Sequence, residues 1–219
     1  MTEERDRLLE AALAHVPFDG MNEAALMAAA GELGISRDMV RVHFPEGGAS
    51  LAAAYHRRGD QALRDWFRAT PPEGRYSDRV AQAIWHRLEL VQPELVRAGA
   101  VVLSLPQHAA LGARLVWETA DIIWQGLGDT SQDVNWYTKR ATLSAVYGSA
   151  VLYWLGDESE SRAETRAFID RRIENVMGFE KFKAQARKFP GVAALTDLAT
   201  GWMRAPGPRD LPGQTKDNR

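Results

Sequence analysis

The chain has 219 residues, of which 45% are hydrophobic, so it is long enough to bury one sizeable core with room for a small satellite unit. It contains no cysteine, which excludes disulfide bonds, thiolate metal ligands and a cysteine nucleophile. The formal net charge of −2 is unevenly distributed: residues 1–48 hold nine Asp or Glu and four Arg, a charge of −5, whereas residues 178–219 hold eight Lys or Arg and four Asp or Glu, a charge of +4.

Three short helices are predicted in the first 48 residues, which begin without the features of a signal or transit peptide. The apolar face of the first helix is marked by Leu8, Ala12 and Val16. Asn22 is suited to cap a second helix that runs to about Leu33, and residues 34–36 form a glycine-containing turn into a third that ends near Phe44. This arrangement is typical of a helix-turn-helix head.

Longer helical patterns follow, and no run of residues alternates in the manner of a β-strand, so we predict an all-α protein. Their approximate ranges are 49–69, 77–91, 93–104, 106–126, 133–155 and 158–186. Pro93 and Pro106 stand at first helical positions, where the missing backbone N–H would have had no partner. We expect a head at 1–48, a helical bundle at 49–186, and an amphipathic helix with a flexible tail at 187–219. No segment reaches the 18 apolar residues of a spanning helix, so we expect a soluble or peripheral protein.

Residues 34–45 resemble the recognition-helix region of the TetR family of transcriptional regulators. His43, Phe44 and Pro45 match that family's pattern, whereas Asp38, Arg41 and residues 46–48 depart from it where the nucleic acid would be contacted. Because neutralisation of phosphates supplies essentially all non-specific affinity, a head of charge −5 should repel DNA. We therefore expect a packing unit, with a ligand-responsive TetR-type regulator as the alternative. As in TetR-like dimers, the last two long helices could pair with a second copy, so we expect a homodimer.

The motifs of the common enzyme classes are missing from the sequence. The five histidines show no metal-binding spacing, and there is no glycine-rich phosphate loop and no nucleophile elbow. We expect His43 to help pack the third helix. The remaining histidines, expected to be solvated or associated with helix caps, are His15, His56, His86 and His108. The sequence therefore favours a protein that is not an enzyme and holds no metal or cofactor.

Apolar residues are abundant within the long helices, and the chain has seven tryptophans. Ligand pockets are commonly built between the helices of a bundle, so the sequence permits an apolar pocket. The candidate lipid-binding residues are Trp85, Leu88, Val102, Leu105, Trp117, Tyr147 and Val151. Packing in an ordinary core explains each of them equally well.

The stretch from Asp133 to Arg140 combines a helix-start signal with two large aromatic residues. Asp133 can cap the first backbone N–H groups and interact favourably with the helix dipole, but a solvated first turn does not need Trp136 and Tyr137. These two rings are candidates for docking a partner. The alternative is that both pack inward against the preceding loop.

A second amphipathic signal follows Pro190, which suits a helix start. One apolar arc of this segment contains Val192, Leu195, Leu198, Trp202 and Met203. Several cations precede it, a combination that suits an interfacial helix at a membrane. The alternative is a last helix docked on its own bundle or on a neighbouring subunit.

One set of motifs is spread over the second half of the chain: Leu105-Pro-Gln-His108, Trp124, Gly128, Asp129, the stretch 133–140 and Tyr147. Through these motifs, nearly the whole chain resembles the family of accessory lipid-binding proteins of coenzyme Q (ubiquinone) biosynthesis, the ninth in the eukaryotic naming series. It implies a TetR-like fold that does not act as a repressor, a pocket for isoprenoid lipids such as quinone intermediates, and a terminal amphipathic helix at membranes. It also implies that the chain binds and supports the demethoxyubiquinone hydroxylase.

By the same resemblance, the residues that form or support the partner-binding patch are Asp121, Trp124, Asp133, Trp136, Tyr137 and Arg140. Where the family has two acidic residues near Asp121, this chain continues with Ile122 and Ile123, which alters the charged part of that contact. The leader of the mitochondrial members is absent, which suggests a bacterial member. We expect it to be cytoplasmic and peripherally associated with the inner membrane.

Overall fold

The computed structural model describes residues 3–132 and 134–186, with side chains up to residue 176. Its helices are α1 (Glu3–Asp19), α2 (Glu23–Leu33), α3 (Arg37–His43), α4 (Gly48–Ala69), α5 (Tyr76–Glu89), α6 (Pro93–Leu103), α7 (Ala109–Gly126), α8 (Val134–Gly156), the 3-10 turn η1 (Glu160–Arg162) and α9 (Ala163–Ala186). The described ranges contain no β-strand, which confirms the predicted all-α class. The membrane-binding candidates Val192, Leu195, Leu198, Trp202 and Met203 lie outside the described residues.

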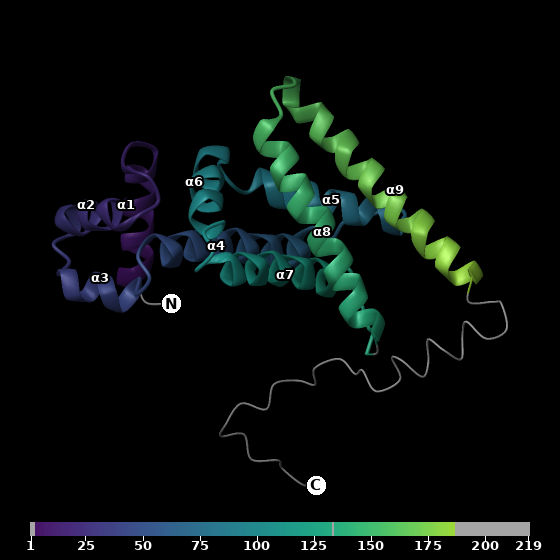
Figure 1. Cartoon of the computed structure of the whole chain (residues 1–219), viewed down its shortest axis with the longest axis horizontal. Coiled ribbons are helices and arrows are strands. Elements are labelled where there is room, and N and C mark those ends of the chain that lie inside the picture. The colour runs from purple at the N-terminus through teal and green to yellow at the C-terminus, as the bar shows by residue number, and fades with distance from the viewer. Residues whose placement is uncertain (1–2, 133, 187–219) are drawn as a thin grey trace, which may run out of the picture.

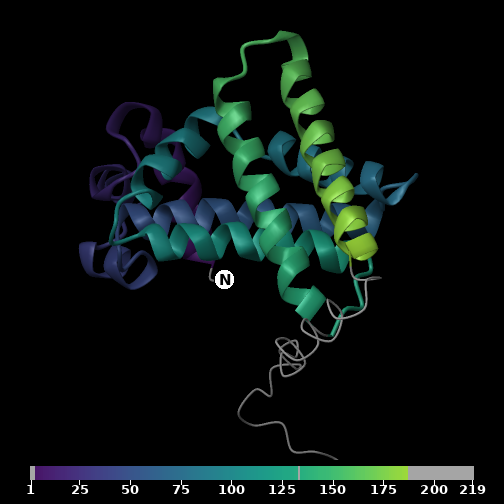
Figure 2. The same ribbon diagram turned by 45° about the vertical axis from the view of Figure 1, so that its right-hand side comes forward.

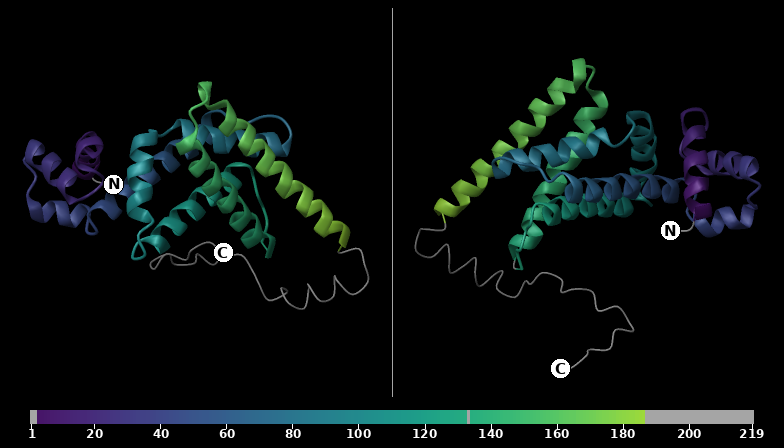
Figure 3. Two further views of the ribbon diagram at one scale, coloured as in Figure 1. Left: turned by 45° about the horizontal axis from the view of Figure 1, so that its top comes forward. Right: turned by 180° about the vertical axis from the view of Figure 1, so that it is seen from behind.

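The helix-turn-helix head lies at one end of the molecule and is joined to the bundle through α4 (Figure 1). Helix α7 packs alongside α4, and α8 crosses α7 before the chain turns back into α9 (Figures 1 and 2). Helix α6 packs against α4 and stands between the head and α8. Figure 3 shows from two further directions that the head lies beyond the end of α4. This arrangement surrounds the space between α6 and α8 with helices of the bundle.

Side-chain caps explain the short helices of the head. The Asn22 Oδ1 atom accepts hydrogen bonds from the backbone N–H groups of Ala24, at 2.8 Å, and Ala25, at 3.3 Å. Helix α2 ends at Leu33 and is capped by Gly34, which adopts the left-handed conformation with φ of 67° that favours glycine. Ser36 then caps α3 by accepting from the Met39 N–H at 3.3 Å. The predicted cap at Asn22 and the turn at residues 34–36 are confirmed.

Two helices begin later than the sequence predicts. Helix α7 was expected from about residue 106 but begins at Ala109, because the chain first makes a turn closed by the His108 N–H donating to the Leu105 carbonyl at 2.8 Å. Helix α9 was expected from about residue 158 but begins at Ala163. Ser161 and Arg162 have φ of 52° and 54°, a conformation that no continuous α-helix contains.

Two clusters of buried apolar side chains share α4. The first joins α1–α3 to the N-terminal half of α4 and to Leu95 of α6, and it contains the predicted face of Leu8, Ala12 and Val16. The second joins the C-terminal half of α4 to α5, α7, α8 and α9. Val91 and Val96 pack against both clusters, so the head and the bundle are in direct contact through α4 and α6.

Candidate functional site

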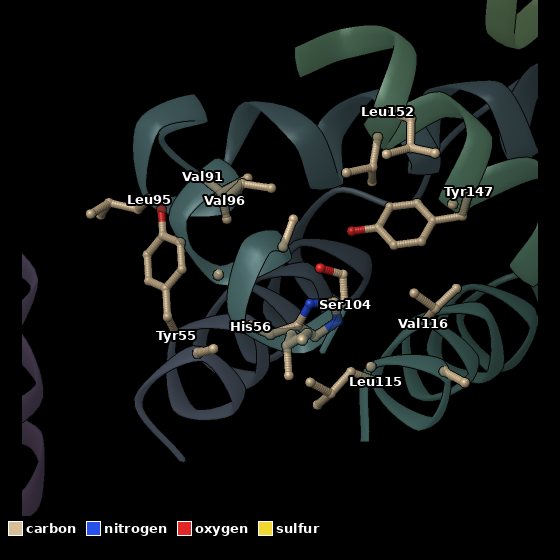
Figure 4. A pocket seen from close by; sticks show the side chains of 18 of the residues that line it. Tyr55, His56, Val91, Leu95, Val96, Ser104, Leu115, Val116, Tyr147 and Leu152 are labelled. Atoms are coloured by element: carbon tan, nitrogen blue, oxygen red, sulfur yellow. The ribbon is translucent and has the colours of Figure 1, made fainter. Parts of the chain in front are cut away.

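A cavity of about 320 Å³ lies between α4, α5, α6, α7 and α8 (Figure 4). Its walls are predominantly apolar, with Val96 and Leu103 from α6, Leu115 and Val116 from α7, and Leu152 from α8. Specific small-molecule sites usually occupy about 300–1,000 Å³, so the cavity is large enough for a ligand. It occupies the space between bundle helices where the sequence permitted a pocket.

One wall of the cavity is polar, and an ion pair buried behind it holds this wall together. The Arg87 Nε atom donates to Asp60 Oδ1 at 2.8 Å, and both side chains are 2% exposed. A second Arg87 nitrogen donates to the His56 carbonyl at 2.9 Å. Gly59 permits this approach, because a Cβ atom at that position would lie 2.7 Å from the Arg87 guanidinium carbon. The pair ties α4 to α5 directly beside the cavity.

His56 belongs to the same polar wall, so the expectation of a solvated or capping histidine is wrong. Its Nε2 atom lies 2.8 Å from the Thr119 hydroxyl, which itself donates to Asp60 Oδ1 at 2.9 Å. The Thr119 hydroxyl also lies 3.2 Å from the Leu115 carbonyl, so it is the shared hydrogen-bonding group of this wall. Burial lowers the pKa of His56 to about 4, although the nearby Asp60 carboxylate favours the protonated ring. His56 is therefore neutral at pH 7.

The hydroxyl of Tyr147 points from α8 into the cavity, across from His56 (Figure 4). Burial raises the pKa of this phenol above its ordinary value. Tyr55 also lines the cavity, but its hydroxyl accepts the Gln92 N–H at 2.8 Å and so supports the start of α6. The hydroxyl of Tyr147 also has a partner, because it forms a hydrogen bond with Thr119 of the polar wall.

Of the seven candidate lipid-binding residues, Leu88, Tyr147 and Val151 line this cavity. Trp85 does not line it, and instead stacks under the Arg166 guanidinium at 4.1 Å from the ring centroid. Val102 packs toward the head, and Leu105 is exposed in the turn before α7. Trp117 lies against Trp136. The seven candidates were chosen for their size and hydrophobicity. Four of them lie at positions that do not border the cavity: Trp85, Val102, Leu105 and Trp117.

A cluster of aromatic and charged side chains surrounds the start of α8. The rings of Trp117 and Trp136 have centroids 6.0 Å apart, and Tyr137 meets Trp136 edge to face at 4.8 Å. The Arg140 guanidinium lies over the Trp136 ring, 4.0 Å from its centroid. Trp136 is half-buried and Tyr137 is 36% exposed. Both rings therefore pack against the bundle and remain partly exposed to solvent.

The Asp129 carboxylate holds this cluster in place. The sequence identified Asp129 only as part of a family motif and not as a site residue. It accepts from Lys139 Nζ at 2.7 Å and from Arg140 at 3.0 Å, and its side chain is 2% exposed. Burial raises the pKa of Asp129, but hydrogen bonds from Lys139, Ser131 and Arg140 outweigh that effect and lower it to about 2. Asp129 lies ten residues before Lys139 and eleven before Arg140. This spacing of an acid and two cations is the sequence signal that could have identified Asp129.

The structure brings five of the six partner-binding candidates together. Asp121 Oδ1 accepts from Arg140 Nε at 2.5 Å, and Trp124 packs below Lys139 and beside Tyr76. Arg140 and Trp124 are buried, so they support the surface from beneath, whereas Tyr137 and part of Trp136 face outward. Asp133 lies outside the described residues. We call Asp121, Trp136 and Tyr137 the ring surface.

The described residues contain no group of acidic and histidine side chains able to hold a metal ion. In the same part of the chain, no helix combines the length and hydropathy needed to cross a bilayer.

The family model described as COQ9 matches residues 109–180. Among curated relatives, the mitochondrial ubiquinone biosynthesis protein coq9 of Schizosaccharomyces pombe is 32% identical over 176 residues, covering 77% of this chain and 68% of that protein. The mitochondrial ubiquinone biosynthesis protein COQ9 of Drosophila melanogaster is 30% identical over 188 residues, and that of Homo sapiens is 28% identical over 181. The chain spans 57% of the length of each of the last two.

Among solved structures, a TetR transcriptional regulator from Nitrosomonas europaea superposes with a TM-score of 0.62 at 19% identity, covering 79% of this chain and 97% of that one. This likeness confirms the predicted TetR-like fold and speaks for the fold alone. The extent of the match to the curated relatives shows more: the chain belongs to the COQ9 family.

Proposed function

We propose that this chain is a non-enzymatic accessory protein of ubiquinone biosynthesis, which binds isoprenoid quinone intermediates at a membrane and presents them to the demethoxyubiquinone hydroxylase. The observation that carries the proposal is an apolar cavity inside the bundle of a chain that belongs to the COQ9 family. A polyprenylated quinone leaves a bilayer with difficulty, because each buried methylene contributes about 0.8 kcal/mol of preference for an apolar site. A protein cavity of similar polarity lowers that barrier.

The ring surface is the proposed docking site for the hydroxylase. Partly exposed aromatic rings supported from beneath by a buried ion pair are well suited to bind a protein partner, because Trp and Tyr dominate the energetics of interfaces. The hydrogen bonds that Arg140 donates to Asp121 and Asp129 fix the guanidinium against which Trp136 packs. Docking therefore requires little reordering of this face.

Membrane association is proposed for the segment after residue 186, on the strength of its amphipathic sequence. The protein would then be peripheral, on the cytoplasmic side of a bacterial inner membrane. A homodimer through α8 and α9 remains part of the proposal, by analogy with TetR-like proteins.

DNA binding is not part of the proposed function. On the described head, Arg37 pairs with Glu23 at 3.3 Å, and His43 lies 2.8 Å from Glu4 Oε1. These contacts engage two of the basic side chains of α3 with acids of the head itself, in a region of charge −5. We expect no salt-dependent binding to duplex DNA, measured by fluorescence anisotropy at low and physiological salt.

The primary test is mass spectrometry of lipids that co-purify with the native chain. A bound isoprenoid quinone precursor supports the proposal. A protein that carries no lipid and shifts a duplex fragment contradicts it in favour of a regulator.

Two substitutions test the remaining steps separately. Trp136→Lys should abolish co-purification with the hydroxylase while circular dichroism stays unchanged, and Ala145→Lys, at an exposed position of the same helix, should leave association intact. Trp202→Asp should reduce sedimentation with anionic vesicles, whereas Thr200→Asp, at a position that is not part of the apolar arc, should not. If Trp136→Lys and Ala145→Lys associate equally with the hydroxylase, docking through the ring surface is contradicted. If Trp202→Asp and Thr200→Asp sediment equally with vesicles, membrane binding by this segment is contradicted.

A further inference from the structure

The corner where α6 ends and α7 begins exposes apolar side chains to solvent. Val101, near the end of α6, is 64% exposed, and Leu105, four residues later, is 43% exposed. Pro106, Ala109 and Ala110 follow and are exposed as well. The left view of Figure 3 shows this corner at an outer edge of the bundle. We call these five residues the corner surface, because apolar side chains gathered in one exposed place indicate a contact with something less polar than water.

Acidic residues are missing from this part of the sequence. Between Glu94 and Glu118, Arg97 and Arg114 are the only Asp, Glu, Lys or Arg side chains. Arg114 pairs with Glu118 at 3.6 Å. The Arg97 guanidinium, which forms no ion pair within the described part of the chain, donates to the neutral carbonyl of Leu155. Arg97 is exposed and lies one helical turn before the corner surface, so an uncompensated positive charge stands beside the apolar side chains.

The backbone of the corner is hydrogen-bonded within itself. The Ser104 N–H donates to the Ala100 carbonyl at 2.9 Å, and the His108 N–H donates to the Leu105 carbonyl at 2.8 Å. The Ser104 hydroxyl donates to the Val101 carbonyl at 2.8 Å. Backbone groups that already have partners lose little when they leave water, and a turn that enters the headgroup region of a bilayer needs this property.

The composition of the corner surface favours lipid over protein as its partner. Protein interfaces gain most of their binding energy from Trp, Tyr and Arg, as on the ring surface, and Leu and Val are under-represented among those residues. The corner surface contains no aromatic side chain, and Gln107, which is also exposed in this turn, carries no charge. Aliphatic side chains beside a cation suit the boundary between acyl chains and anionic headgroups.

We propose that the corner surface enters the headgroup region of a bilayer that contains anionic lipid, with Arg97 at the level of the phosphates. The inference rests on the proposed membrane association, and it adds a second contact, made by the folded bundle, to the one proposed for the segment after residue 186. This contact also orients the molecule. Ser104 and Ala109 line the cavity and are exposed at the same corner, so the opening of the cavity faces the bilayer.

The chain has no cysteine, so a single introduced cysteine can carry a fluorophore that reports this contact directly. Leu105→Cys in the full chain is labelled with the polarity-sensitive fluorophore NBD and titrated with vesicles of equal parts phosphatidylcholine and phosphatidylglycerol. We expect the emission to rise and to shift to shorter wavelength, because the label leaves water. Asp170→Cys, labelled in the same way at an exposed position of α9, is the control and should show no shift.

Unlabelled variants test whether the corner surface contributes affinity for the same vesicles. Leu105→Asp should weaken binding about tenfold, since it removes an apolar side chain from the bilayer and adds a negative charge. Phe18→Asp is the matched control and should bind as the wild type does, because Phe18 is 88% exposed on α1 and lies outside the corner surface. Arg97→Gln should weaken binding about fivefold, and should leave binding to vesicles of phosphatidylcholine alone unchanged.

The outcomes separate this inference from the proposed function. A silent label at residue 105 in a chain that still sediments with vesicles, or wild-type binding by Leu105→Asp, overturns the corner contact and leaves the contact after residue 186 in place. Equal shifts of the labels at residues 105 and 170 overturn an oriented contact. A full chain that binds no vesicle overturns both proposals. If Leu105→Asp binds vesicles normally but loses the hydroxylase, the corner surface is a protein interface and the lipid assignment is overturned.

Discussion

At the scale of single residues, the ion pair of Asp60 and Arg87 has a clear consequence for the stability of the fold. Both charges are buried, and removing one partner leaves the other without compensation. Asp60→Ala should therefore lower the free energy of unfolding by about 3 kcal/mol, measured by urea denaturation. The double variant Asp60→Leu, Arg87→Met should recover most of this loss. A single variant as stable as the wild type contradicts the proposed burial of the pair.

Asp129 predicts a specific dependence of stability on pH. Its folded pKa of about 2 lies below its ordinary value of 3.8, so its contribution is fully present above about pH 4 and disappears as the pH falls through about 2. Asp129→Asn should lower the free energy of unfolding at pH 7 by about 2 kcal/mol. The difference between wild type and variant should shrink between about pH 4 and pH 2 in urea titrations. A difference that stays constant over this range excludes titration of Asp129 as the cause.

The sequence predicted some of these residues and missed others for identifiable reasons. Trp136 and Tyr137 were selected as docking candidates because nothing in a solvated helix start requires two rings, and their docking role stays a prediction. His56 was misplaced because no local spacing reveals its contact with Thr119, which lies on another helix 63 residues later. Contacts between distant helices depend on how the helices pack, and a periodic pattern carries no such information.

At the scale of helices, Asp157 explains why α9 starts where it does. Its Oδ2 atom accepts from the backbone N–H of Thr165 at 2.8 Å and from the Thr165 hydroxyl at 2.5 Å, while Oδ1 accepts from the Ser159 N–H. Hydrogen bonds from Ser159 and Thr165 hold the pKa of Asp157 well below its usual range. The sequence predicted a break at this point, but the reach of one carboxylate across eight residues placed the helix start at Ala163.

Removal of this cap should loosen the start of α9 without unfolding the bundle. Asp157→Ala leaves the Thr165 N–H without its side-chain acceptor, so amide hydrogen exchange at Thr165 should accelerate several-fold. Glu158→Ala, which removes the adjacent exposed acid, should leave exchange unchanged. Identical exchange in both variants shows that the Asp157 bonds do not hold the helix start.

At the scale of the whole molecule, the fold class and the head were predictable because helical periodicity and cap residues are local signals. The cavity was predictable only as a possibility. Its lining depends on small residues such as Gly112 and Gly148, which leave space between helices and give no hydrophobic signal in the sequence. The sequence instead suggested large apolar residues as the lining, and two of these, Trp85 and Trp117, lie outside the cavity.

Filling the cavity should separate the stability of the bundle from its ability to bind ligand. At Gly148 a Cβ atom would lie 4.0 Å from the nearest Val116 atom, so Gly148→Leu can extend into the cavity without a backbone clash. The exchange of glycine for leucine inside a helix should raise the free energy of unfolding by about 0.5–1 kcal/mol. The wild type should gain about 1.4 kcal/mol from 1-decanol, an apolar probe ligand, at ten times its dissociation constant, and Gly148→Leu should gain nothing.

The matched control is Gly31→Leu in α2, because a Cβ at Gly31 meets no atom within 4 Å and this glycine does not line the cavity. This variant should show a similar gain in helix stability and keep the full stabilisation by ligand, since only its helix propensity changes. Thermal and urea unfolding with and without 1-decanol measure both effects. If Gly148→Leu is still stabilised by ligand as strongly as Gly31→Leu, the ligand binds outside the cavity between α6 and α8, and the site assigned to the isoprenoid must be sought on another face of the molecule.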